Sequence, residues 1–425
     1  MDELTLGLKE YIEASPTPYH AVENAERILR ESGFERIEAK SSGRLEAGKG
    51  YYFSRTGFTG GCATSLMAFI LPSDGVKPKG VRVCASHTDS PCFRLKPNAV
   101  MEGGDYCRLN TERYGGAINS TWLDRPLAIA GRVIIRDGDK TVSKTVKLDG
   151  NVIMPNVAPH MNNQINSGYV YSAHTDLVPL LGDKGSAESF RARLAGAAGC
   201  EYGDIIDYDL SVYNPASALV WGGNGEYISA PRLDDLQCVY TTLIGFTRSK
   251  PVNYVPVLAL FDCEEVGSSC ISGADSDLLR LTVNIISEAC GVSADELTAG
   301  GFLLSADNAH AVHPNSPDLA DVTNRPRING GIVLKYNSSK RYITDGESGA
   351  FVRLLCRRNG IALQTYANRS DMPGGSTLGN ISGTQIPLPG ADIGLPQIEM
   401  HSSYETAGTG DGALLAELAR VFYSE

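Results

Sequence analysis

Residues 255–268 read Val-Pro-Val-Leu-Ala-Leu-Phe-Asp-Cys-Glu-Glu-Val-Gly-Ser. The apolar run 255–261 is typical of a strand that is buried on both faces of a sheet. The acidic pair Glu264-Glu265 follows this strand almost directly. Two adjacent carboxylates are costly to place there unless cations or water compensate their charge. We expect an extended backbone here, on which the two adjacent side chains point to opposite sides, so one can bind a metal while the other faces a reacting water.

A second strand is predicted at residues 81–86, and it runs into the turn His87-Thr88-Asp89-Ser90-Pro91. In an α/β sheet such a turn lies at the carboxyl end of a strand, where ligands bind. Histidine can bind a metal through one ring nitrogen while a carboxylate orients the ring. An HxD pair alone is weak evidence for a metal site, because such a histidine is more often a hydrogen-bonded residue of a loop. His87 and Asp89 become informative only together with further ligands.

Helical patterns lie on both sides of a central region with strand patterns. Apolar residues recur at helical spacing in residues 21–29 and again in residues 236–246. Between them, residues 93–227 contain short strands, such as 132–136 and 141–148, which an Asp-Gly turn separates. The chain is also longer than one ordinary domain of about 150 residues.

This order of elements predicts an α/β fold in which one domain is interrupted by another. Residues 1–92 and 228–425 form the α/β domain, and residues 93–227 form a β-rich inserted domain. The strand ends that carry the candidate ligands belong to the α/β domain.

Composition and charge exclude several classes of protein. Of 425 residues, 42% are hydrophobic and 20% charged, with a net charge of −11 and no basic stripe for nucleic acid or an anionic membrane. The acidic start Met1-Asp2-Glu3-Leu4 is unlike a secretory signal, and no apolar stretch approaches the length of about 18 residues that a membrane helix needs. We expect a soluble, cytoplasmic protein with no nucleic-acid or membrane partner.

The cysteines do not indicate a thiolate metal site. Ten cysteines are scattered along the chain without a CxxC pair. We expect them to be reduced residues of the core in a reducing cytosol.

The remaining candidate ligands are histidines and aspartates. His20 and His174 lie in polar contexts typical of surface or capping groups. The other five histidines lie near residues that could share a functional site: His87, His160, His310, His313 and His401. Asp307 lies in Ser-Ala-Asp-Asn-Ala-His, residues 305–310. Asp234-Asp235 opens a predicted helix, where an acidic pair is commonly just a favourable partner of the helix dipole.

Two histidines and three carboxylates match what a pair of zinc ions about 3.5–4 Å apart needs, with one carboxylate bridging them. The residues alone leave the roles of Asp234 and Asp307 undecided. Other catalytic motifs are absent from the sequence: it has no GxSxG elbow, Walker A loop, HExxH helix or GxGxxG after a strand.

Several segments resemble the aspartyl aminopeptidase family of dinuclear zinc peptidases, and the likeness extends from Ser15 to Ser402. The most specific matches are ASHTDSP (85–91), SAPRLD (229–234), EEVGS (264–268), DNAHAVHPN (307–315), RSDMPGGSTLG (369–379) and DIGLPQ (392–397).

The resemblance implies the roles of the site residues. His87, Asp234, Glu265, Asp307 and His401 would hold two Zn²⁺ ions, for which Co²⁺ or Mn²⁺ could substitute, with Asp234 bridging them. Glu264 would be the general base, and Asp89 the carboxylate behind His87. The fold it implies is a zinc-peptidase α/β/α catalytic domain with an inserted β-rich dimerisation domain.

The resemblance also implies a homododecamer built from dimers, in which His160 reaches the partner's active site to contact substrate. Two departures from the family pattern bear on these roles. Asp235 stands where the family usually has Asn, which adds a negative charge near the metals. Pro159 and residues 161–163 also differ from the usual residues around His160.

The implied activity is the metal-dependent removal of N-terminal residues from peptides. A preference for Asp or Glu needs a cation in the first pocket, and the candidates are Lys335, which we favour, Arg341 and Arg369. A neutral, Leu-type preference is the other possibility.

Two alternatives use the same fold. A dinuclear zinc deacylase or carboxypeptidase would use the same ligands, but it would need a cationic clamp for a substrate carboxylate. A non-catalytic scaffold would keep the fold without the chemistry. The retention of every ligand and of Glu264 argues against a scaffold.

Overall fold

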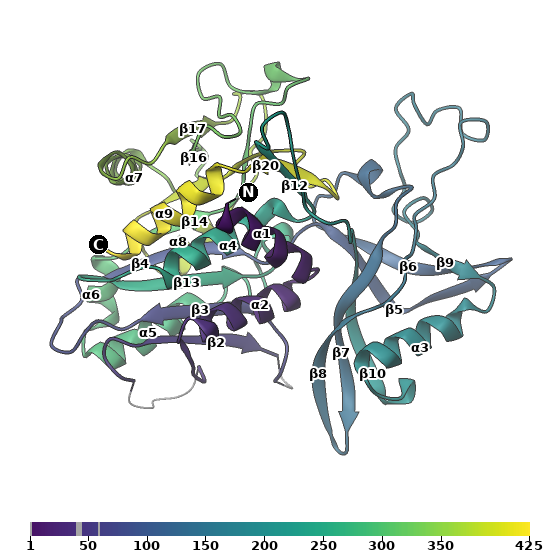
Figure 1. The fold of residues 1–425 in the computed structure, drawn as a ribbon, viewed down its shortest axis with the longest axis horizontal. Helices are drawn as coiled ribbons and strands as arrows, with labels where there is room; N and C mark the ends of the chain where they lie inside the picture. The colour runs from purple at the N-terminus through teal and green to yellow at the C-terminus, as the bar shows by residue number, and fades with distance from the viewer. Residues whose placement is uncertain (1, 40–44, 58–59) are drawn as a thin grey trace.

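The computed structural model describes residues 2–39, 45–57 and 60–425. Figure 1 shows two parts. At the left, helices lie on both sides of a large sheet, and both chain termini lie in this part. At the right, long antiparallel strands and one helix form a smaller part.

The large sheet has nine strands in the order β1-β2-β3-β13-β4-β14-β18-β16-β17. They are β1 (Glu35–Arg36), β2 (Gly50–Thr56), β3 (Ala63–Ile70), β4 (Val81–His87), β13 (Val255–Phe261), β14 (Phe302–Ala306), β16 (Ile332–Tyr336), β17 (Leu363–Ala367) and β18 (Gly390–Gly394). The neighbours β13, β4, β14 and β18 are parallel. Their carboxyl ends therefore meet at one edge of the sheet.

Helices cover both faces of this sheet, as the α/β/α prediction requires. One core contains side chains of α1 (Glu3–Ala14), α2 (Pro18–Glu31), α4 (Leu233–Thr247), α7 (Gly346–Arg358) and α9 (Asp411–Tyr423). The opposite core contains side chains of α5 (Leu278–Cys290), α6 (Ala294–Ala299) and α8 (Leu378–Gln385). Strand β13 contributes Leu258 and Leu260 to the first core and Val257 and Ala259 to the second. This alternation explains why its sequence is apolar throughout.

The second sheet has six antiparallel strands in the order β8-β7-β10-β5-β6-β9. They are β5 (Cys92–Gly103), β6 (Tyr106–Tyr114), β7 (Ala128–Asp137), β8 (Lys140–Lys147), β9 (Leu180–Asp183) and β10 (Ile205–Tyr213), accompanied by α3 (Ser186–Ala198). A separate core joins this sheet to α3 through residues such as Phe93, Val133, Phe190 and Leu194.

A third sheet joins distant segments next to the first. Its five strands, in the order β11-β12-β20-β19-β15, are β11 (Leu219–Trp221), β12 (Tyr227–Ala230), β20 (Glu405–Gly408), β19 (Pro396–Ile398) and β15 (Ala309–His310). Four 3-10 turns complete the elements of the described residues: η1 (Asn119–Trp122), η2 (Tyr202–Asp204), η3 (Glu264–Val266) and η4 (Pro317–Leu319).

The predicted hairpin at the Asp-Gly turn is confirmed, with Asp137 opposite Lys140. The region also contains a longer strand that the sequence did not indicate, since β5 has 12 residues. Helix α3 was also missed, because its buried stripe is limited to small residues and the pair Phe190 and Leu194.

The domain boundaries stay a prediction. The six-stranded sheet runs from Cys92 to Tyr213, and strand β11, inside the predicted insertion, pairs with β12 in the five-stranded sheet. Among the described residues, no helix has the length and apolar character that crossing a membrane would require.

Candidate functional site

An open cavity of about 360 Å³ lies at the edge where the parallel strands end. His87 ends β4, Glu264 and Glu265 follow β13, and Asp307 follows β14. Seven residues predicted from the sequence line this one cavity: His87, Asp234, Glu264, Glu265, Asp307, Lys335 and His401.

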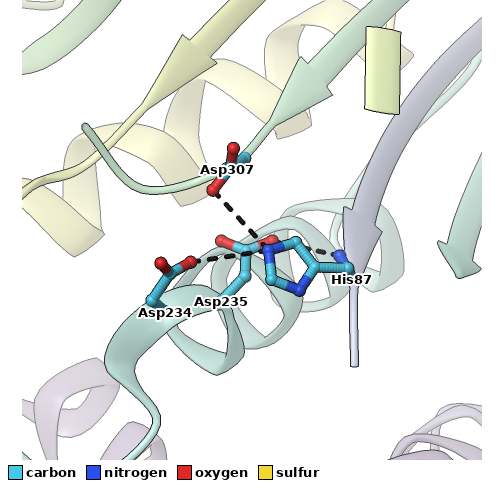
Figure 2. A group of neighbouring side chains, drawn as sticks. All are labelled: His87, Asp234, Asp235 and Asp307. Atoms are coloured by element: carbon cyan, nitrogen blue, oxygen red, sulfur yellow. Dashed lines mark hydrogen bonds and ion pairs between the residues drawn. The ribbon is translucent and has the colours of Figure 1, made fainter. Parts of the chain in front are cut away.

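His87 is the centre of the first group of potential metal ligands. Its Nε2 lies 3.4 Å from Asp234 Oδ1 and 3.6 Å from Asp307 Oδ1. Its backbone N–H donates to Asp235 Oδ2 at 3.1 Å. Figure 2 shows the ring of His87 with these contacts to Asp234 and Asp307. One ligand atom from each of these four residues lies within 4.8 Å of the others.

Asp234 also belongs to a second group, with Glu265 and His401. His401 Nε2 lies 3.6 Å from Asp234 Oδ2 and 3.5 Å from Glu265 Oε2. The two carboxylate oxygens of Asp234 thus face different histidines. This is the placement that a carboxylate shared by two cations needs.

Asp89 lies behind His87, but its contacts differ from those expected. The ring Nδ1 of His87 lies 3.0 Å from the backbone carbonyl of Asp89 and 3.5 Å from its Oδ1. The carboxylate instead accepts the backbone N–H groups of Glu264 and Glu265, each at 3.1 Å. Asp89 therefore links the strand end that carries His87 to the turn that carries both glutamates.

The prediction that Glu264 and Glu265 lie on an extended backbone is wrong. They begin the 3-10 turn η3, which follows Cys263 in a left-handed conformation with φ of 64°. The tight turn lets both side chains reach the same cavity.

The same loop corrects the expectation that all cysteines are reduced. Cys263 and Cys270 form a disulfide with a Cα–Cα distance of 6.6 Å, because the loop folds back on itself. The other eight cysteines are free.

Burial and mutual repulsion shape the electrostatics of the carboxylates. Burial and the charge of Asp234 raise the pKa of Glu265 well above its usual range. Burial, together with the charges of Asp307 and Asp89, raises the pKa of Glu264 to about 8, although His87 opposes this. Burial also opposes ionisation of Asp307, but the Nζ of Lys335 at 3.2 Å and the ring of His87 together outweigh it and lower the pKa of that carboxyl. The carboxylates in this cavity therefore carry more negative charge than the neighbouring cations neutralise.

The donor set fits metal ions. Asp234 Oδ1 and Glu265 Oε1 are buried and accept no hydrogen bond from any residue in the described part of the chain. Buried polar atoms without a partner are rare in native proteins and indicate a missing ion or water. Imidazole nitrogens and carboxylate oxygens are ligands that zinc takes. The residues present therefore fit a zinc site.

The candidate substrate-binding residues lie in different places. Lys335 is only 2% exposed, and its Nζ donates to the carbonyl of Asn308 at 2.7 Å as well as to Asp307. Arg341 and Arg369 line a separate cavity of about 720 Å³, and Arg369 is paired with Asp371. His160 is exposed in the segment between β8 and β9 and is not among the described residues that line the ligand cavity.

Two of the remaining histidines differ in their relation to the site. His310 lines the cavity, whereas His313 accepts the backbone N–H of Asn315 and does not line it in the described structure.

Glu405 is a site residue that the sequence did not reveal. It is 1% exposed, and its Oε2 accepts the backbone N–H of Asp234 at 3.0 Å. Its Oε1 accepts the backbone N–H of His401 at 2.8 Å. No sequence pattern marks this carboxylate, because the strand pairing of β20 with β12 brings it to Asp234 from far along the chain.

Comparison with known proteins gives consistent matches over the whole chain. The model of the family described as Aminopeptidase I zinc metalloprotease (M18) matches residues 11–423. The probable M18 family aminopeptidase 2 of Clostridium acetobutylicum is 38% identical over 433 residues, covering 99% of both chains. Its counterpart in Clostridium novyi is 37% identical over 428 residues, covering 98% of both chains.

A solved structure, that of the S. cerevisiae mApe1 dodecamer, resembles this chain with a TM-score of 0.84. The two are 27% identical, and the match covers 99% of this chain and 98% of that one.

Zinc added to chelator-treated protein is expected to displace protons at pH 7. Metal ligands must be deprotonated to bind, and the pKa values of His87 and Glu265 are both raised well above their usual ranges. The apparent zinc affinity should therefore increase as the pH rises. Titration calorimetry in two buffers with different ionisation enthalpies measures the protons released.

The variant Glu265→Gln provides the control: it lacks one carboxyl that must lose its proton to bind a metal, so it should bind less zinc and release fewer protons in total. Equal binding enthalpies for the unaltered protein in both buffers would contradict this electrostatic description.

Proposed function

The chain belongs to the M18 family of zinc aminopeptidases, a family of metallopeptidase hydrolases, and we propose that it removes N-terminal residues from peptides at a centre of two zinc ions. The family match confirms the resemblance to the aspartyl aminopeptidase family. The observation that carries the two-ion proposal is the position of Asp234, whose two oxygens face two groups of ligands.

In this proposal, His87, Asp234 and Asp307 hold one ion, and Asp234, Glu265 and His401 hold the other. The inter-residue distances of 3.4–3.6 Å around each histidine support these two sets. Asp235 is the third aspartate of the possible ligand group that contains His87, and we assign it a supporting role because its Oδ2 accepts the backbone N–H of His87. The same contact is open to the amide oxygen of the Asn that the family usually has there.

Bound zinc ions would act as Lewis acids on the scissile carbonyl and lower the pKa of a water molecule. We assign Glu264 the role of general base, and two observations support it: its side chain lines the cavity, and Asp89 accepts its backbone N–H. It would take a proton from the attacking water and deliver it to the leaving amine. Burial is the largest cause of the raised pKa of Glu264, and repulsion by neighbouring carboxylates adds to it. Cations held by those carboxylates would remove the repulsion and so lower the pKa of Glu264, which favours the ionised form that a base needs.

The variant Glu264→Gln should lose at least about 100-fold in kcat, because an amide cannot accept the proton. It should still bind zinc as the unaltered protein does. The matched variant Glu265→Gln should instead lose zinc, since it removes a ligand. Steady-state kinetics together with zinc content by atomic emission measures both effects. A fully active Glu264→Gln variant would exclude Glu264 as the base.

The substrate is proposed to be a peptide with a free N-terminal amine, with Asp or Glu as the preferred first residue. Lys335 supports the acidic preference, because it is a buried cation in the wall of the cavity. Its Nζ already contacts Asp307, so its charge also stabilises the ionised form of this proposed metal ligand. Arg341 and Arg369 are less suited, since they line the separate cavity.

Free-amine Asp-, Glu- and Leu-peptides and their acetylated forms test this specificity, with zinc, cobalt or manganese added and then removed by chelator. The free-amine peptides should be cleaved only with metal, and the acetylated ones not at all. Lys335→Met should lower kcat/KM for the Asp-peptide about 10- to 100-fold more than for the Leu-peptide, as expected for a lost hydrogen bond to a charged group.

If Lys335→Met lowered kcat/KM equally for the Asp- and Leu-peptides, Lys335 would have no role in acidic specificity and would only support Asp307. Cleavage of acetylated substrates would favour the deacylase alternative, and inactivity of fully metallated protein would favour the scaffold.

We also propose that the protein self-associates in the cytoplasm as a homododecamer of dimers formed by residues 93–227. The dodecameric S. cerevisiae relative supports the assembly, and the exposure of His160 and of Met161, at 83%, leaves this segment free to meet a partner subunit.

Light scattering should therefore give a mass near twelve times 45.4 kDa. His160→Ala should lower kcat without changing that mass. A stable monomer with full activity would contradict the assembly and the role of His160 together.

A further inference from the structure

Three consecutive residues at the end of strand β6 and directly after it reach the ligand cluster at the edge of the nine-stranded sheet. Tyr114 is the last residue of β6, and Gly115 and Gly116 follow it. Strand β6 lies in the right-hand part of the molecule in Figure 1, whereas β4 and β13 lie in the left-hand part. The segment Tyr114-Gly115-Gly116 thus connects one sheet to the site of the other.

The hydroxyl of Tyr114 donates to Asp89 Oδ2 at 2.7 Å. The residue is 8% exposed, and the guanidinium carbon of Arg94 lies over its ring, 3.8 Å from the ring centroid. A tyrosine hydroxyl is protonated at neutral pH, so it donates to a carboxylate. Such a charge-assisted bond in a buried place is strong and fixes the acceptor.

Asp89, which Tyr114 holds in place, contacts three residues of the site. Its carboxylate accepts the backbone N–H groups of Glu264 and Glu265, and its backbone carbonyl contacts the ring Nδ1 of His87. Without the Tyr114 hydroxyl, Oδ2 of Asp89 would keep only the Glu265 N–H. The carboxylate would then be free to rotate away from the turn that carries the two glutamates.

Gly115 and Gly116 contact the second ligand group directly. Gly115 has φ of +72°, and a Cβ built there would lie 3.1 Å from Glu265 Cβ and 3.3 Å from its Oε2. The carbonyl of Gly116 lies 3.2 Å from His401 Nδ1. This contact leaves Nε2 of His401 facing Asp234 and Glu265. The backbone N–H of Ile118 also donates to the carbonyl of His401 at 3.0 Å.

We propose that Tyr114-Gly115-Gly116 is a positioning segment through which the six-stranded sheet sets the geometry of the metal centre, with Tyr114 acting through Asp89 as a positioning residue. This inference rests on the proposed metal centre. Residues that orient metal ligands from behind typically change metal affinity 10–100-fold when they are altered.

The test is Tyr114→Phe in the full-length protein, which keeps the ring under Arg94 and removes one hydroxyl. Zinc affinity, measured by competition with a chromophoric chelator, should fall about 10–100-fold. The visible absorption spectrum of the cobalt-loaded variant should also change, since it reports ligand geometry. kcat should fall more than KM rises, because the base and the ligands are displaced.

Tyr208→Phe is the matched control. Its hydroxyl donates to the carbonyl of Lys96 and accepts the backbone N–H of Ala99, both within the six-stranded sheet. It should lose stability without changing zinc affinity or the cobalt spectrum. A second variant, Gly115→Ala, should weaken zinc binding as well, because its Cβ enters the space beside Glu265.

Unchanged zinc affinity and cobalt spectrum in Tyr114→Phe would overturn the inference alone. The same changes in Tyr208→Phe would also overturn it, since they would show a general loss of sheet stability. Failure of the unaltered protein to bind zinc would overturn the proposed function, and this inference with it.

Discussion

The repulsion between buried carboxylates is the constraint on which the rest of the structure depends. Several acidic side chains crowd around His87 where the parallel strands end: Asp89, Asp234, Asp235, Glu264, Glu265 and Asp307. Two unit charges 4 Å apart repel by about 4 kcal/mol at the effective dielectric constant of a protein surface. Lys335 neutralises part of this charge through Asp307. The remainder calls for cations, and for a framework stiff enough to hold like charges together.

The fold supplies that framework largely through the backbone. Three carboxylates accept backbone N–H groups of site residues: Asp89 those of Glu264 and Glu265, Asp235 that of His87, and Glu405 those of Asp234 and His401. These hydrogen bonds compensate negative charge without introducing competing cations. They also tie together strand ends, a helix start and a loop that are far apart in the sequence. All three sheets contribute to one small site.

Sequence patterns revealed the parts of this arrangement that arise locally. The apolar run of β13 and the HxD pair that begins at the last residue of β4 identified the strand ends. A strand that is buried on both faces is apolar throughout, so its end is easy to see in the sequence. The adjacent glutamates were recognisable because charge is unusual directly after such a strand. Asp234 and Asp307 were ambiguous from the residues, since an aspartate at a helix start or in a loop has common structural roles. The family resemblance, not their spacing, gave them metal-binding roles, which stay a prediction.

What could not be predicted depends on contacts between distant segments or on backbone turns. Glu405 and Tyr114 act through partners that only the sheet pairing brings near them. The turn η3 replaced an expected extended backbone because Cys263 adopts a left-handed conformation that no residue type there announces. The disulfide of Cys263 with Cys270 follows from the same turn.

Anomalous scattering at the zinc absorption edge, from crystals of the zinc-loaded protein, tests the central claim most directly. The account predicts two peaks about 3.5–4 Å apart, one on each side of Asp234, with His87 and Asp307 at one peak and Glu265 and His401 at the other. A single peak, or two peaks that do not share Asp234, would contradict it.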